Sequence, residues 1–126
     1  MAKQMATLLV LDVKSNDVRP VQCSELDDFY RELDADVFDI ACRKIGGRYY
    51  DIFCDDMGLW RENPVVSAIS PKLEPMLVGN LVFANHNDAG ETTSLTDDDM
   101  DRIVHNLYMV KSVNDDKEHM VVMCDY

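Results

Sequence analysis

The stretch that decides the fold is residues 37–54, VFDIACRKIGGRYYDIFC. Two alternating apolar patterns flank Gly46-Gly47, a dipeptide typical of a hairpin turn. The apolar residues are Phe38, Ile40 and Cys42 before the turn, and Tyr50, Ile52 and Cys54 after it. A two-residue loop would set Cys42 opposite Asp51 and mix polar with apolar positions. We therefore expect a three-residue loop with a left-handed glycine, which keeps both apolar sets on one face.

Two further strands are predicted before this hairpin. Residues 7–13 are apolar at both odd and even positions, which indicates a central strand covered on both faces. After a turn at residues 15–17, residues 18–23 return as a second strand. Pro20 lies within it and cannot donate a ladder hydrogen bond, so this strand is expected at an edge or a bulge.

Two amphipathic segments predict helices. The first begins at Ser24, an N-cap whose capping box is completed by Asp27, and ends near Asp34. The second begins at Thr96, with Asp99 as the matching acid. Its expected buried face consists of Met100, Ile103, Val104, Leu107 and Tyr108.

The remaining sequence completes one domain over residues 1–126. Residues 59–75 contain three prolines and are expected to be irregular. Residues 76–85 are expected to contain one buried strand, in which Gly79 indicates a bulge or close packing, and residues 119–126 a last strand. The predicted order is β-β-α-β-β-β-α-β. Short turns between strands favour a single α+β domain with a mixed, mainly antiparallel sheet and both helices on one face.

Composition excludes several classes of function. The chain has 126 residues, with 24 acidic against 12 basic side chains and a net charge of −12. Such charge opposes direct binding to nucleic acid or to anionic membrane, and favours basic partners, cations or simple solubility. No apolar run is long enough for a membrane span or signal segment. The four cysteines form no C-x-x-C pair, so we expect reduced thiols, a cytoplasmic location and no cofactor.

Several turn and strand motifs occur in a characteristic order. They are residues 44–47, residues 50–59 continuing to Asn63-Pro64, residues 77–80, and Gly90-Glu91 leading to residues 94–96. Together they resemble the uncharacterised bacterial and phage family numbered 3846 among domains of unknown function. The resemblance covers roughly residues 8–107. It implies a small stand-alone protein of phage, plasmid or integrated-element type, and it supplies no catalytic or binding residue.

Acidic residues gather between positions 25 and 39, where Arg31 alone opposes seven carboxylates. Such a surface can imitate the phosphates of nucleic acid and bind a basic, nucleic-acid-binding host protein. The alternative is a solvated surface with helix starts matched to the dipole. The hairpin tip and the irregular segment offer Arg and aromatic side chains suited to a protein contact or a homodimer. The interaction candidates are Asp28, Glu32, Asp34, Asp36, Arg48, Tyr49 and Trp60.

A second hypothesis is a small divalent-metal-dependent hydrolase or ligand-binding domain. Clustered carboxylates hold hard cations through oxygen, and a histidine at a strand end can join them. The candidate ligands are Asp51, Asp55, Asp56 and His86. Aspartate is equally favoured in turns because its side chain caps the local backbone. We therefore favour a non-enzymatic interaction protein.

Overall fold

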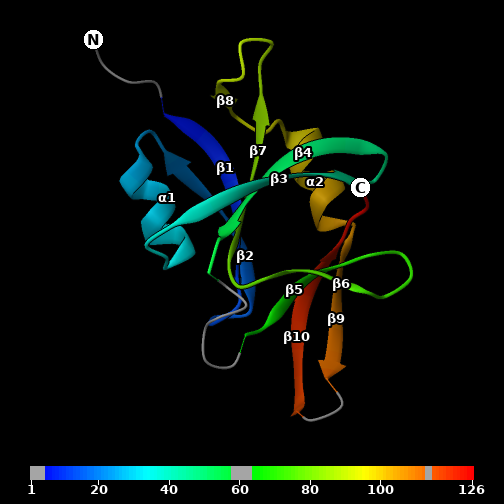
Figure 1. The fold of residues 1–126 in the computed structure, drawn as a ribbon. Coiled ribbons are helices and arrows are strands. Elements are labelled where there is room, and N and C mark those ends of the chain that lie inside the picture. Colours follow the sequence, from blue (N-terminus) through cyan, green and yellow to red (C-terminus); the bar gives the residue numbers. More distant parts are fainter. Residues whose placement is uncertain (1–4, 58–63, 113–114) are drawn as a thin grey trace.

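The computed structural model describes residues 5–57, 64–112 and 115–126. In these residues two helices and ten strands form an α+β domain whose two sheets are mostly antiparallel (Figure 1). The predicted fold class is confirmed. The predicted single sheet is wrong, because the strands divide into a six-stranded and a four-stranded sheet. Neither described helix is long and apolar enough to cross a membrane.

The six-stranded sheet combines the first four strands of the chain with two later ones. Its order is β2 (Asp17–Cys23), β1 (Ala6–Asp12), β7 (Leu81–His86), β4 (Arg48–Asp55) and β3 (Phe38–Ile45), with β8 (Thr92–Thr93) beside β7. The central position predicted for the first strand is confirmed, since all four residues from Leu8 to Leu11 are buried. Pro20 lies in the edge strand β2, opposite Leu9, as expected.

The second sheet contains segments that the sequence analysis assigned to an irregular segment, to a longer strand and to the end of a helix. Its order is β6 (Pro75–Val78), β5 (Val66–Ile69), β10 (Asp115–Met123) and β9 (Leu107–Ser112). The expectation that residues 59–75 are irregular is wrong for residues 66–69, which form β5. Residues 59–63 lie outside the described part of the chain. The expectation of one strand within residues 76–85 is also wrong, because β6 and β7 are separate strands. Gly79, with a φ of 78°, turns the chain from β6 in one sheet to β7 in the other.

The β3–β4 hairpin has the register that the sequence argument rejected. Cys42 pairs with Asp51, and the loop consists of Gly46 and Gly47 alone. Both glycines have positive φ, 58° and 88°, as in the two-residue turns whose twist matches that of the strands. The expected three-residue loop is wrong because Cys42 lies on an exposed part of the edge strand, where mixing polar and apolar neighbours costs little.

Helix α1 (Leu26–Leu33) begins one residue later than predicted. Its N-cap is Glu25, and the acid that completes the cap is Asp28 instead of Asp27. The Asp28 carboxylate accepts hydrogen bonds from the backbone N–H groups of Ser24, at 2.8 Å, and Glu25, at 3.1 Å. The predicted end is confirmed, since Asp34 has a left-handed φ of 52°.

Helix α2 (Asp97–Val104) begins as predicted. Asp99 donates its N–H to Thr96 Oγ1 at 3.1 Å, and the Asp99 carboxylate accepts from the Thr96 N–H at 2.9 Å. Its predicted length is wrong. Leu107 and Tyr108 belong to β9, which pairs with β10. The apolar spacing at those positions also suits a strand, and tertiary pairing decides between the two.

The two helices pack on opposite faces of the large sheet. Phe29 of α1 packs in a cluster with Leu8 and the even residues of β1. Ile103 of α2 packs in a second cluster with Leu9 and the odd residues of β1. Figure 1 shows α1 and α2 on opposite sides of β7. The prediction that both helices cover one face is therefore wrong: a strand that is apolar on both faces needs cover on both.

Candidate functional site

Three of the four acidic interaction candidates on and around α1 are neutralised within the molecule. Asp28 forms an ion pair with Arg31 at 3.0 Å, and Glu32 lies 3.3 Å from Arg19. Asp34 pairs with Lys14. Backbone hydrogen bonds from Ser24 and Glu25 lower the pKa of Asp28. These carboxylates hold α1 in place and contribute little net charge toward a partner.

Asp36, the fourth candidate, is different. It is exposed and forms no ion pair or side-chain hydrogen bond within the described residues. It lies two residues before β3, close in sequence to Asp39, which is also exposed. The hairpin register places Asp39 opposite Cys54, and Asp56 donates its N–H to the Val37 carbonyl at 3.1 Å.

These contacts bring four carboxylates to one end of the hairpin. We call this region the acidic hairpin end and define it by its four acids, Asp36, Asp39, Asp55 and Asp56. A pocket of about 270 Å³ lies between it and β6. The pocket is lined by Asp39, Cys54, Asp55, Asp56, Pro75, Met76, Leu77 and Val78. Acidic residues of the hairpin thus share the pocket with the apolar residues of β6, which suits a ligand with an aliphatic stem and a cationic head.

The thiol in this pocket, that of Cys54, has low reactivity. Cys54 is buried, and its sulfur donates to the Asp39 carbonyl at 3.7 Å. Burial, together with the neighbouring negative charge of Asp39, raises the pKa of the Cys54 thiol to about 11. A thiol of this pKa is protonated at neutral pH and is a weak nucleophile. The pocket is consequently better suited to binding than to nucleophilic chemistry.

The structure separates the four metal-ligand candidates into two places. His86 Nδ1 lies 2.8 Å from Asp51 Oδ2. Asp55 and Asp56 line the pocket, and Asp55 is four residues along β4 from Asp51, roughly 13 Å for an extended strand. Among the described residues no three His, Cys, Asp or Glu side chains are grouped to hold a metal ion. The observed Asp51–His86 contact is a cross-strand pair between β4 and β7.

The hairpin tip carries the basic and aromatic candidates. Arg48 is exposed, and its Nη1 lies 3.5 Å from Asp99 Oδ1. Tyr49 is exposed, and its hydroxyl donates to the backbone carbonyl of Tyr126 at 3.2 Å. Trp60 lies outside the described residues. The tip therefore contacts α2 and the C-terminal residues, at the opposite end of the hairpin from the acids.

A buried polar network beside the tip was not predicted. Asp99 is fully buried; its Oδ1 accepts from the Tyr50 hydroxyl at 2.7 Å, and its Oδ2 from the Asn85 amide at 2.7 Å. Arg102 Nη1 donates to the Tyr50 oxygen at 2.7 Å. Burial raises the pKa of Asp99, but hydrogen bonds from Thr96, Tyr50 and Asn85 outweigh burial and hold the pKa well below its usual range.

This network fixes α2 to the large sheet. Its acid, Asp99, was expected only as the second half of a capping box. Its sheet partner Tyr50 lies 49 residues earlier in the chain, so sequence spacing gives no sign of the contact. Both oxygens of the carboxylate accept hydrogen bonds, which makes the network a structural connection between helix and strand.

Comparison with known proteins gives one match. The family model described as Domain of unknown function (DUF3846) matches residues 5–108. The chain therefore belongs to the DUF3846 family, and the resemblance noted in the sequence is confirmed. The search of curated proteins found no match. The search of solved structures found none either.

Proposed function

We propose that this member of the DUF3846 family is an interaction protein whose acidic hairpin end binds a basic segment of a partner protein. The observation that carries the proposal is the pocket between β3–β4 and β6, which three acidic residues line together with Met76, Leu77 and Val78. Lysine and arginine bury an aliphatic stem against apolar surface while their charged heads contact carboxylates.

Net charge supports the same choice of partner. At −12 the protein repels nucleic acid and anionic lipid and attracts basic proteins. Nucleic-acid-binding proteins carry the basic grooves that an acidic surface can occupy. We propose such a protein as the partner, in keeping with an accessory protein of phage or mobile-element type.

The structure changes which acids should be tested. Replacing Asp28 or Asp34 would disturb the cap or the end of α1 as well as the charge. Asp36 and Asp39 are exposed and are better probes. A matched control is the pair Asp88 and Glu91, exposed acids in the turn between β7 and β8.

The experiment compares three tagged proteins in a pull-down from host-cell lysate. They are the native chain, Asp36→Lys with Asp39→Lys, and Asp88→Lys with Glu91→Lys. We expect the native protein and the control to retain a basic partner that high salt releases, and the hairpin variant to lose it. Equal retention by both variants would show that the acidic hairpin end is not the binding surface.

A further inference from the structure

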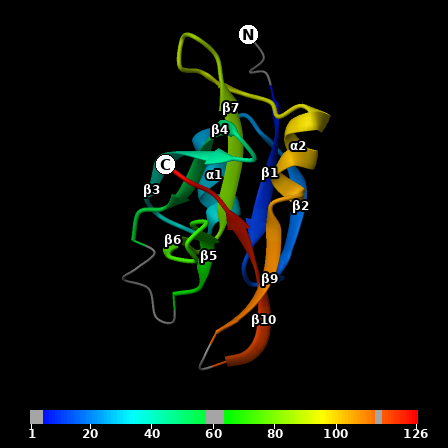
Figure 2. The same ribbon diagram turned by 90° about the vertical axis from the view of Figure 1, so that its right-hand side faces the viewer.

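The edge of β3 is open to another strand. Within the part of the chain that the structure describes, β3 is the outermost strand at one edge of the large sheet, and β4 is the one strand that pairs with residues 38–42. Figure 2 shows β3 at the outer side of the molecule, beside the C-terminus. An exposed sheet edge presents unpaired N–H and C=O groups that a partner strand can use.

The hydrogen bonds of Lys44 show which backbone groups point outward. Lys44 exchanges two backbone bonds with Asp125, at 2.7 and 2.9 Å, on the side away from β4. Backbone groups of an antiparallel strand alternate in direction, so those of Phe38, Ile40 and Cys42 also point outward. Residues 38–42 consequently leave room for an added strand of about five residues, one for each edge position.

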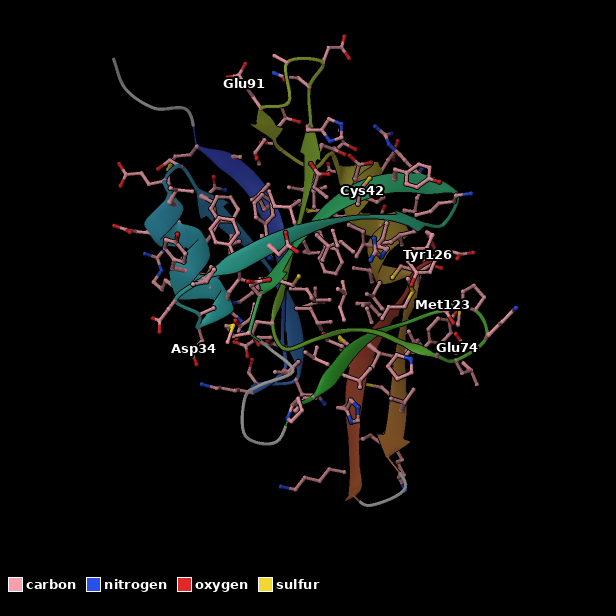
Figure 3. All side chains as sticks on the ribbon, viewed as in Figure 1. Asp34, Cys42, Glu74, Glu91, Met123 and Tyr126 are labelled. Carbon is pink, nitrogen blue, oxygen red and sulfur yellow. The ribbon has the colours of Figure 1, made fainter. Side chains whose placement is uncertain are left out.

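Two of these outward groups are held by side chains of β3 itself. The Asp39 carboxylate accepts the N–H of Ile40 at 2.8 Å, and Arg43 donates to the Cys42 carbonyl at 3.0 Å. Figure 3 labels Cys42 on the hairpin and Tyr126 near its tip. Charged side chains on an edge strand discourage non-selective pairing. A basic ligand that pairs with Asp39 would release the Ile40 N–H for a partner carbonyl.

The two faces of the edge differ in chemistry. Asp39 lies on the same face as Cys54, and both residues line the pocket. Ile40 lies on the other face and is 49% exposed, and Val37, just before the strand, is 50% exposed. Side chains of an added strand alternate between the same two faces. One face therefore calls for basic side chains and the other for apolar ones.

We infer that the β3 edge accepts, by strand addition at residues 38–42, an extended partner segment in which lysine or arginine alternates with apolar residues. The inference rests on the proposed function and specifies its binding mode. The basic side chains meet Asp39 beside the pocket, and the apolar ones cover Ile40 on the other face. Backbone hydrogen bonds supply affinity, and the two faces supply selectivity.

Charge selects a basic partner over a second copy of this chain. Pairing two β3 edges would bring the four acids of each acidic hairpin end close together, in molecules that each carry a net charge of −12. Like charges across an interface oppose association. A basic strand removes this repulsion.

The test uses two fluorescein-labelled peptides of equal composition. One has the alternating sequence VKVRVK, and the other is the rearranged VVVKKR. Binding is measured by fluorescence anisotropy at low and high salt. We expect the alternating peptide to bind about tenfold more tightly, because only it presents basic and apolar side chains to the correct faces. The backbone amide NMR signals of Phe38, Ile40 and Cys42 should shift on binding.

Variants separate strand addition from simple charge attraction. Ile40→Pro removes an outward N–H that is not used by β4, and should weaken binding about tenfold through loss of backbone bonds. Asp39→Asn should weaken it severalfold, whereas Asp88→Asn, with the same change of charge in the β7–β8 turn, should not. A VKVRVK peptide N-methylated at alternate residues keeps its charge and should lose binding, which gives the same answer without altering the protein's fold.

The results distinguish the inference from the proposed function. Equal, salt-sensitive binding of the alternating, rearranged and methylated peptides would overturn strand addition, but it would still support the proposal that the protein binds a basic partner. Absence of binding by every peptide at low salt would count against both. A concentration-dependent dimer of the free protein that Ile40→Pro abolishes would make a second copy the occupant of the edge.

Discussion

The buried network around Asp99 gives the sharpest prediction about stability. Asp99→Asn keeps the shape of the side chain and removes its charge. One acceptor oxygen becomes an NH₂ group, which faces either the Tyr50 hydroxyl or the Asn85 amide, both now at 2.7 Å from the carboxylate. The substitution therefore loses at least one charge-assisted hydrogen bond: the NH₂ group either displaces the bond donated by the Tyr50 hydroxyl or faces the N–H donors of Asn85 and Thr96.

The expected loss follows from the bonds involved. A hydrogen bond to a charged group contributes about 1.5–3 kcal/mol, and a buried donor left without an acceptor costs about 1–3 kcal/mol. Since Asp99 is fully buried, solvent does not replace the missing contacts. We expect Asp99→Asn to lower the free energy of unfolding by about 3 kcal/mol.

Urea unfolding followed by circular dichroism measures this change. Asp97→Asn is the matched control, because Asp97 is an exposed acid in the first turn of the same helix and should cost about 0.5 kcal/mol. Tyr50→Phe and the double variant complete a cycle, which should give a coupling of about 1–2 kcal/mol for the Tyr50–Asp99 pair. A loss below about 1 kcal/mol for Asp99→Asn would refute the reasoning.

Three other predictions follow from the same structure. The pKa of Asp99 is depressed in the folded state, so its stabilisation is present above the unfolded pKa and is lost as pH falls below about 4; acid unfolding curves should show a smaller pH dependence for Asp99→Asn than for the native chain, and parallel curves would contradict this. Gly46→Ala should destabilise the protein by about 2 kcal/mol and Gly47→Ala by about 1 kcal/mol. Both glycines have positive φ, but only a Cβ at Gly46 would lie 2.7 Å from Arg102 Cγ. Equal melting temperatures of the two variants would show that the Arg102 side chain moves aside. Under native conditions a maleimide should label one cysteine by mass spectrometry, the exposed Cys42, because burial raises the pKa of the other thiols to about 11; labelling of several cysteines would mean that the core opens. These other thiols are Cys23, Cys54 and Cys124.

Local signals in the sequence determined much of the secondary structure. Residues 7–13, apolar at every position but Thr7 and Asp12, predicted a central strand, and Pro20 predicted an edge. The Thr96–Asp99 capping box predicted the start of α2. Each of these features depends on neighbours within a few residues, where backbone geometry and side-chain type suffice.

Tertiary structure decided the features that depend on partners far apart in sequence. The division into two sheets at Gly79, the strand β9 in place of further helix, and the hairpin register all depend on which surfaces the segments cover. An apolar run shows that a segment is buried but does not show which sheet it joins.

The candidate site divides in the same way. Sequence identified Asp36, Asp55 and Asp56 as acids, but assigned the first to a partner surface and the other two to a metal. The fold alone gathered Asp55 and Asp56 with Asp39 beside β6, and left Asp51 with His86 elsewhere. It also neutralised Asp28 and Glu32 with arginines. Composition determines how much charge a chain carries, whereas long-range packing decides which charges remain free to meet a partner.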